Sequence, residues 1–174
     1  MAPDTDPQLH SRRYFKIIDR SVDVALAVAP VPLHVLDVGC GNGELLRELI
    51  ERVPYANQYV GIDPSQGNIE AARHAADERL DFVQASADDM PFPAGHFDLV
   101  IASMLFSKSP SPGNALSEIA RVLTDAGRFV LIDDAKPADI AALLAAAGFE
   151  IERRETVYRS RFVVPQVRAY VTGA

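Results

Sequence analysis

The chain has 174 residues, which is enough for one domain with a sizeable core and too few for two. With 48% apolar and 24% charged residues, its composition is that of an ordinary globular protein. The formal net charge of −7 argues against nucleic acid as a partner, because phosphate binding needs a basic surface, and the single cysteine excludes an internal disulfide and a cysteine-based zinc cluster.

The N-terminal residues MAPDTDPQLH lack the basic and then apolar order of a signal peptide. No apolar stretch of the sequence reaches the length of a membrane span. We therefore expect a cytoplasmic protein that does not associate with membranes.

Strand and helix patterns alternate along the chain. Residues 1–8 are expected to form a flexible tail. Residues 9–29 carry apolar side chains at helical spacing, and Pro30 and Pro32 then forbid continuation of the helix. Residues 33–174 are expected to form the core, so that the whole chain is a single domain.

Short apolar runs rich in β-branched residues are typical of strands that are buried on both faces of a parallel sheet. These runs occupy residues 33–38, 58–63, 80–85, 97–102 and 128–133. Helical patterns lie after four of them, at residues 43–53, 65–78, 113–123 and 137–148. This alternation predicts parallel strands joined by helices that lie on both faces of the sheet.

Two further strand patterns, at residues 149–158 and 161–173, follow one another without a helix between them. We expect them to pair as antiparallel neighbours, with a bulge at Pro165. The predicted fold is therefore an α/β, Rossmann-like, doubly wound sheet of seven strands, which is mostly parallel with an antiparallel C-terminal strand.

Residues 35–46, VLDVGCGNGELL, place three glycines where the first strand turns into a helix. In doubly wound sheets the ligand lies beside this turn, and Gly39, Gly41 and Gly43 allow a sharp bend with close approach to the main chain. The helix start favours an anionic group, and Asp63 at the end of the second strand is placed to accept hydrogen bonds from ribose hydroxyls. The pattern predicts a site for a nucleoside that carries an anionic group.

A detail of the motif distinguishes between nucleoside ligands. The dinucleotide fingerprint G-x-G-x-x-G has a third glycine where this chain has Glu44, whose charge would repel a pyrophosphate. An amino-acid sulfonium ligand has no phosphate to repel, and Asp37 is placed to hold its ammonium group. An NAD-linked oxidoreductase is therefore disfavoured.

Over about residues 33–150 the chain resembles the class I S-adenosylmethionine-dependent methyltransferases, specifically the small-molecule type with a seven-stranded sheet. Four motifs carry the resemblance, and they occur in the order found in that family. They are VLDVGCGNG (35–43), GIDPS (61–65), SADDMPFPAGHFDLVIAS (86–103) and ALSEIARVLTDAGRFVLID (115–133). The third resembles the adenine-binding turn followed by the fourth strand.

The resemblance implies S-adenosyl-L-methionine as the cofactor and S-adenosyl-L-homocysteine as the product. The residues implied to contact the cofactor are Tyr14, Asp37, Gly39, Cys40, Gly41, Asp63, Pro64, Ser86, Ala87, Asp88 and Ala102. Ser86 stands where the family often has an aspartate, and Asp88 is close enough in sequence to substitute for it. Tyr14, on the first helix, is expected to cover the cofactor.

Several of these residues have structural alternatives. Asp37 is also suited to capping the glycine turn, and Asp63 to starting a helix. Cys40 is interpreted as a small residue packed in the turn rather than as a nucleophile, and Asp98 as a residue that satisfies a turn. No metal site is expected, because the histidines lack a second ligand at a suitable spacing.

The sequence does not identify the catalytic group. Many small-molecule relatives carry a histidine after the fourth strand, where this chain has Ser107 and Lys108. Lys108 and Asp133 are candidates, although in-line methyl transfer does not require a base.

Only a few residues separate Asp133 from the helix that begins at Pro137, so no lid segment is inserted there. We therefore expect an open site for an unidentified small-molecule or carrier-bound acceptor, or a homodimer whose second subunit completes the pocket. The alternatives are a member that binds the cofactor without transferring its methyl group, and a partner protein that retains only the fold.

Overall fold

A computed structural model places most of the chain. The residues that it describes are 7–29, 31–32, 34–54, 56–74, 77–104, 109–133, 137–158 and 167–173. No helix within these ranges is long and apolar enough to cross a lipid bilayer.

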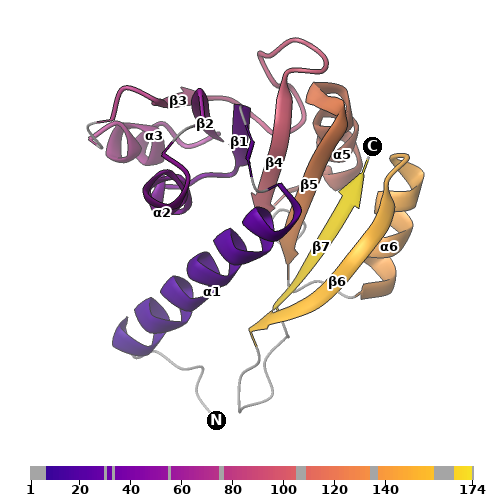
Figure 1. The fold of residues 1–174 in the computed structure, drawn as a ribbon, viewed down its shortest axis with the longest axis horizontal. Coiled ribbons are helices and arrows are strands. Elements are labelled where there is room, and N and C mark those ends of the chain that lie inside the picture. Colours follow the sequence, from indigo (N-terminus) through magenta and orange to yellow (C-terminus); the bar gives the residue numbers. More distant parts are fainter. Residues whose placement is uncertain are drawn as a thin grey trace.

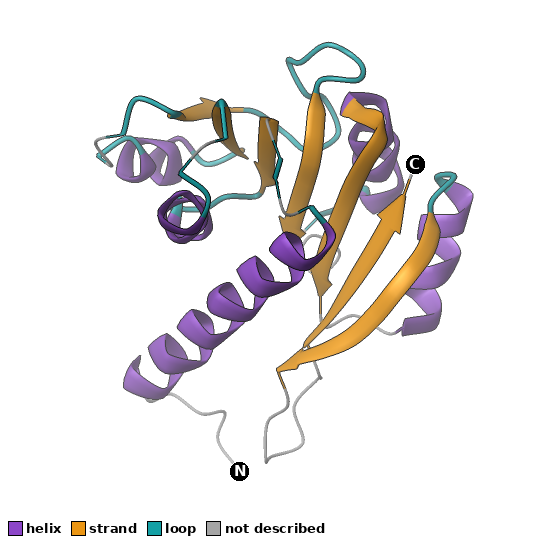
Figure 2. Cartoon of the chain, in the orientation of Figure 1, coloured by secondary structure: helices purple, strands orange, loops and turns teal. Residues whose placement is uncertain are grey.

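Helices and strands alternate through most of the described chain (Figure 2). The helices are α1 (Pro7–Val28), α2 (Glu44–Arg52), α3 (Gln66–Ala72), α5 (Pro112–Val122) and α6 (Pro137–Ala146). The strands are β1 (His34–Val38), β2 (Gln58–Asp63), β3 (Leu80–Gln84), β4 (Phe97–Ser103), β5 (Leu123–Asp133), β6 (Glu150–Tyr158) and β7 (Val167–Gly173).

The strands form one seven-stranded sheet in the order β3-β2-β1-β4-β5-β7-β6 (Figure 1). Neighbours from β3 to β5 are parallel, and β7 runs antiparallel to both β5 and β6. The expected α/β architecture with a mostly parallel sheet is confirmed. The chain winds outward from β1 to β3 on one side and from β4 to β5 on the other, so the topological switch point lies between β1 and β4.

The parallel strands β1, β2, β4 and β5 end along one edge of the sheet, which we call the carboxyl rim. Its last strand residues are Val38, Asp63, Ser103 and Asp133. In open α/β sheets, ligands bind at this rim beside the switch point. The glycine-rich segment that follows β1 therefore starts at the position where a ligand is expected.

Alternating strand side chains build one hydrophobic core on each face of the sheet. The first core contains Val35, Tyr59, Ile101 and Val130 and is covered by α1, α2 and α3. The second contains Leu36, Val60, Val100 and Leu131 and is covered by α5 and α6. Figure 1 shows the two groups of helices on opposite sides of the sheet, as expected from right-handed crossovers.

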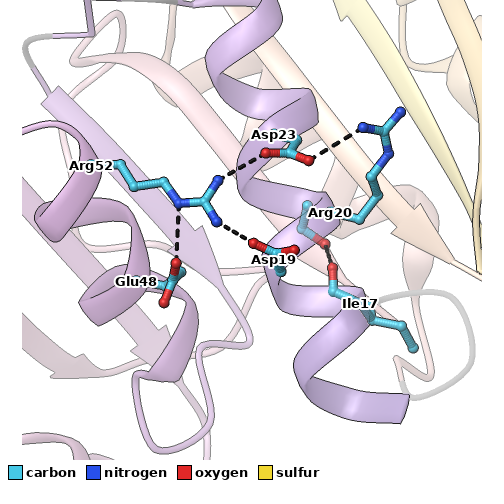
Figure 3. A network of polar contacts seen from close by, with 7 residues as sticks. Ile17, Asp19, Arg20, Asp23, Glu48 and Arg52 are labelled. Carbon is cyan, nitrogen blue, oxygen red and sulfur yellow. Dashed lines mark hydrogen bonds and ion pairs between the residues drawn. The ribbon is translucent and has the colours of Figure 1, made fainter. Parts of the chain in front are cut away.

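Charged side chains join α1 to α2 (Figure 3). Arg52 of α2 forms ion pairs with Asp19 and, at 2.8 Å, with Asp23, both on α1. Its Nε atom also donates to Glu48 at 3.1 Å, and Arg20 pairs with Asp23 at 3.3 Å. This network links α1 to the helix that begins at the glycine-rich segment.

The structure corrects two of the expected boundaries. The first helix begins at Pro7, so residues 7–8 do not belong to a tail. β5 begins at Leu123 rather than at residue 128, directly after α5 ends at Val122. The cause is an irregular pairing, in which Phe97 lies opposite Leu123 and the register shifts before Leu99.

The ends of two other elements also differ from the expectation. The third helix ends at Ala72 instead of continuing to residue 78. The last strand begins at Val167 rather than at residue 161, and it pairs with β6 in the antiparallel sense that the sequence predicts. Pro165, where a bulge was expected, lies outside the described residues.

Candidate cofactor site

The segment between β1 and α2, residues 39–43, forms a tight loop at the carboxyl rim. Gly39, Gly41 and Gly43 have φ angles of 78°, 55° and 80°, in the left-handed region that other residues avoid. The N–H groups of Gly39 and Cys40 both donate to the carbonyl oxygen of Ile62, at 2.8 and 2.9 Å. The bend that the sequence predicted is therefore present, and it is tied to the end of β2.

The two sides of this loop have different surroundings. A Cβ atom added at Gly39 or Gly41 would meet nothing within 4 Å. A Cβ atom at Gly43 would lie only 2.6 Å from Cζ of Phe82, which comes from β3. The loop is therefore open beside its first two glycines and closely packed at its third.

Asp63, at the end of β2, holds the open side of the loop. Its Oδ2 atom accepts the N–H of Gly41 at 3.1 Å, and its Oδ1 atom accepts the N–H of Ser65 at 2.9 Å. The side-chain amide of Asn68, on α3, also donates to Oδ1 at 3.1 Å. The carboxylate is thus fixed in orientation, and Asp63 as a whole is 8% exposed.

Asp37 lies beside Asp63 on the same face of the sheet. In the register of β1 and β2 it is opposite Gly61, and it is only 2% exposed. Burial, and secondarily the charge of Asp63, raise the pKa of Asp37 to about 7. Within the described residues, no hydrogen-bond donor reaches its carboxyl group, and burial and the neighbouring charge are the causes of the pKa shift.

The turn of residues 86–89 lies next to Asp63, where the sequence places adenine binding. The N–H of Ala85 donates to the carbonyl oxygen of Asp63 at 3.3 Å. The hydroxyl of Ser86 donates to the carboxylate of Asp88, and the N–H of Asp89 donates to the carbonyl oxygen of Ser86 at 3.3 Å. The Ser86 hydroxyl thus orients the Asp88 carboxylate within an exposed turn.

The remaining predicted cofactor residues that the structure describes also lie at the carboxyl rim. Pro64 is exposed directly after Asp63, and Ala102 is buried near the end of β4. The thiol of Cys40 is buried in the loop, and this burial raises its pKa, which fits a packing residue rather than a nucleophile. Tyr14 belongs to α1, but its side chain lies outside the described structure.

Of the two candidate catalytic residues, the structure describes only Asp133, which does not lie on the face of the sheet that carries Asp37. Asp133 ends β5 and is fully buried, and strand alternation places it on the face of α5 and α6, opposite to Asp37. Lys108 lies outside the described residues, as does Ser107. In the described part of the chain, no group of three or more metal-ligating side chains is positioned to hold a metal ion.

Two residues at this site were not predicted. Asn68 follows Asp63 by five residues, and this short spacing is the only signal by which the sequence could have indicated it. Phe82 packs under both Gly43 and Gly61, where added Cβ atoms would lie 2.6 and 2.7 Å from its ring. Its role depends on the pairing of β2 with β3, which the sequence alone does not specify.

Comparisons with known proteins agree with this geometry. Residues 36–131 match the model of a family described as a methyltransferase domain. The chain is 37% identical over 121 residues to a demethylmenaquinone methyltransferase of Thermus thermophilus. The aligned residues make up 68% of this chain and 54% of that relative. The chain spans about half the length of the curated relatives it matches.

Another relative and one solved structure extend the comparison. The chain is 30% identical over 165 residues to a malonyl-[acyl-carrier protein] O-methyltransferase of Geobacter sulfurreducens, which covers 91% of this chain and 61% of that relative. The crystal structure of the [4+2]-cyclase SpnF superimposes with a TM-score of 0.73 and 27% identity, over 80% of this chain and 59% of that chain.

Proposed function

Because the chain belongs to the methyltransferase domain family, we propose that it transfers a methyl group from S-adenosyl-L-methionine to an unidentified small-molecule or carrier-bound acceptor. S-adenosyl-L-homocysteine is then the product. The observation that carries the proposal is a glycine loop with free space beside Gly39 and Gly41, bound to Asp63, whose carboxyl group neighbours that of Asp37.

The residues at the carboxyl rim fit this cofactor. The free space beside Gly39 and Gly41 suits the methionine part, and the unpartnered carboxyl group of Asp37 suits its ammonium group. Asp63, already oriented by three donors, retains one lone pair, on Oδ2, for a ribose hydroxyl. We assign adenine binding to the turn of residues 86–88. Contacts with the outer parts of the cofactor are assigned to Tyr14, Cys40, Pro64 and Ala102.

The protein's part in the reaction is mainly to position the two reactants. The bound cofactor supplies an electrophilic methyl group on a sulfonium. Holding an acceptor atom in line with that bond can by itself supply a large share of the acceleration. The burial of Asp133 speaks against its use as a base, so Lys108 remains the candidate for lowering the pKa of an acceptor.

Titration calorimetry with S-adenosylmethionine, S-adenosylhomocysteine and NAD tests the cofactor assignment. We expect binding of the two adenosyl compounds and not of NAD. Asp63→Asn should weaken that binding about tenfold, because hydrogen bonds to a charged carboxylate are lost. Asp98→Asn is the matched control, since this partly exposed carboxylate accepts the N–H of His34 at 3.0 Å at the opposite edge of the sheet.

The likeness to a [4+2]-cyclase favours a second candidate function, in which the chain binds the cofactor without consuming it. The two candidates differ in the fate of S-adenosylmethionine during turnover of an acceptor. Release of one S-adenosylhomocysteine per product would support methyl transfer, whereas product formation with the cofactor unconsumed would support the second candidate. Failure to bind any adenosyl compound would instead indicate a partner protein that retains only the fold.

We further propose that the acceptor site is open and accepts a large or carrier-bound group. In support, β5 ends at Asp133 and α6 begins at Pro137, which leaves no room for an inserted lid. A possible homodimer would complete the site from a second copy. Light scattering with activity assays tests this idea, and a monomer that efficiently methylates a free small molecule would contradict it.

We also propose a location for the protein in the cell. The lone cysteine and the acidic net charge of −7 support a cytoplasmic protein that does not bind nucleic acid.

A further inference from the structure

The segment of residues 85–96, which connects β3 to β4, carries the proposed adenine turn at one end. At the carboxyl rim it is attached through the N–H of Ala85, which donates to Asp63 at 3.3 Å. At its other end the N–H of Gly95 donates to the carbonyl oxygen of Arg121, at 2.9 Å. Its middle portion has no strand or helix of its own, so other groups must fix it.

Two side chains of α5 bind the backbone directly after the turn. Glu118 accepts the N–H of Met90 at 2.8 Å. Arg121 donates to the carbonyl oxygens of Met90 at 3.0 Å and Phe92 at 2.7 Å. Three backbone groups of the segment, two of Met90 and one of Phe92, are therefore held by one pair of charged residues, which lie about one helical turn apart.

The pair is rigid. Nε and Nη2 of Arg121 each donate to a different carboxylate oxygen of Glu118, both at 2.7 Å, in the bidentate geometry that is strongest for such ions. The hydrogen bonds from Arg121 lower the pKa of Glu118 to about 2, so that it stays ionised at neutral pH. The side chain of Met90 is buried, and the ring of Phe92 packs edge-on against Phe97 with centroids 5.1 Å apart.

We propose that the Glu118–Arg121 pair positions the turn of residues 86–88 and thereby sets the selectivity of the cofactor site for adenine. The proposal rests on the proposed function, in which this turn binds the base. A carboxylate such as Asp88 accepts from the exocyclic amino group of adenine, whereas a 6-oxo purine presents an acceptor at the same place. Selectivity of this kind requires the carboxylate to be held in one position.

The test compares the dissociation constants of S-adenosylhomocysteine and S-inosylhomocysteine, which differ at the 6-position of the base. The parent chain should prefer the adenosyl compound by about tenfold or more. In Arg121→Gln this preference should fall about fivefold, because the carbonyl oxygen of Phe92 loses its charged donor and that of Met90 keeps only the N–H of Phe92. Glu118→Gln keeps an acceptor for the N–H of Met90, so its preference for the adenosyl compound should fall less. Arg121→Lys should not restore the preference, because a single ammonium group cannot replace the several donors of a guanidinium group.

Arg79→Gln is the matched control. Arg79 also pairs with an acid, Asp77 at 2.9 Å, and donates to a backbone carbonyl, that of Pro54, but it lies at the opposite end of β3 from the turn. The Arg79→Gln variant should prefer the adenosyl compound as strongly as the parent does. Equal weakening of both compounds in the Arg121 and Glu118 variants, or a lower melting temperature with an unchanged preference, would show that the pair is only structural.

These outcomes separate the inference from the proposed function. A parent chain that binds neither compound would overturn both. A parent chain that binds S-adenosylhomocysteine with selectivity unaffected in all three variants would overturn the positioning role alone.

Discussion

At the scale of single residues, the charge on Asp37 opposes folding. Its pKa of about 7 in the folded protein compares with an ordinary value of 3.8, and burial is the main cause. Between these two values the folded state binds more protons than the unfolded state, so the free energy of unfolding falls as the pH rises. This pKa difference lowers the free energy of unfolding of the ligand-free protein by about 4 kcal/mol above neutral pH.

Asp37→Asn should therefore stabilise the ligand-free protein at pH 8 by about 2–4 kcal/mol and change little at pH 4. Urea unfolding at the two pH values measures this difference. Asp81→Asn, at an exposed position on β3, serves as the control and should show no such pH dependence. If the variant were no more stable than the parent at pH 8, another group in the folded protein would already offset the cost of burying the Asp37 charge.

The same substitution should have the opposite effect on the ligand. We expect Asp37→Asn to bind S-adenosylmethionine at least about tenfold more weakly at pH 7.5, because the ammonium group loses its charged partner. In the parent, affinity should rise between pH 6 and 7.5 as Asp37 ionises, and calorimetry should show this rise absent from the variant. A parallel pH profile in both proteins would exclude Asp37 as the ammonium partner.

Two glycines of the loop should separate folding from binding. Gly43→Ala places a methyl group 2.6 Å from Phe82 and keeps a φ of 80°, so it should lower the free energy of unfolding by about 2–4 kcal/mol. Gly41→Ala meets no neighbour, so it should cost only about 1 kcal/mol from its positive φ while weakening cofactor binding. Thermal unfolding and calorimetry distinguish the two effects.

The double variant Gly43→Ala/Phe82→Leu provides the control for this explanation. The smaller leucine should recover part of the stability that Gly43→Ala loses. If Gly41→Ala proved the more destabilising of the two single variants, the open space beside Gly41 would not exist in solution.

At the scale of elements, the network centred on Arg52 should make a modest and salt-dependent contribution. Arg52→Gln removes ion pairs to Asp19, Asp23 and Glu48, but all of these side chains are partly exposed, so we expect a loss of about 1 kcal/mol at low salt. The loss should shrink at 1 M salt. Urea unfolding at both salt concentrations tests this expectation.

Arg20→Gln is the comparison for the Arg52 variant. Arg20 pairs with Asp23 at 3.3 Å within α1, so it does not link α1 to α2. Its replacement should cost less than that of Arg52. Equal losses in the two variants would indicate that the link between the helices contributes nothing beyond local helix stability.

The order of elements was predictable because each buried strand is a short apolar run and each helix has its own period. The start of β5 was not predictable, because Asp125, Ala126 and Gly127 are residue types that are depleted in strands, and the strand begins early through the pairing of Phe97 with Leu123. Local sequence describes propensity, whereas strand ends depend on a partner that is distant in the chain.

The same distinction explains which site residues the sequence revealed. Gly39, Gly41 and Asp63 lie in compact motifs whose geometry is local, and the structure places them together. Phe82 and Arg121 act through contacts with residues about 20 to 40 positions away. The sequence around each of these two residues contains no pattern that predicts such contacts.

At the scale of the whole molecule, both cores pack against the same sheet, which supports the expectation of a single domain. Leu49 of α2 and Leu116 of α5 are fully buried, in the first and second core respectively. Leu49→Ala and Leu116→Ala should each cost about 2–5 kcal/mol, and their effects should add within about 0.5 kcal/mol in the double variant.

Calorimetry should show a single unfolding transition for the parent and for both variants, because neither core can survive without the shared sheet. Two resolved transitions, of which each variant moves only one, would show that the faces unfold independently and would contradict the single-domain proposal.

The position of β7 also has a consequence for the order in which the molecule can be assembled. β7 follows β6 in the chain, yet it lies between β5 and β6 in the sheet. When β6 leaves the ribosome, it therefore has no neighbour to join, although β1 to β5 can already pair with one another. Until β7 has also left the ribosome, the backbone of β6 is an unprotected edge that a chaperone or another nascent chain can bind.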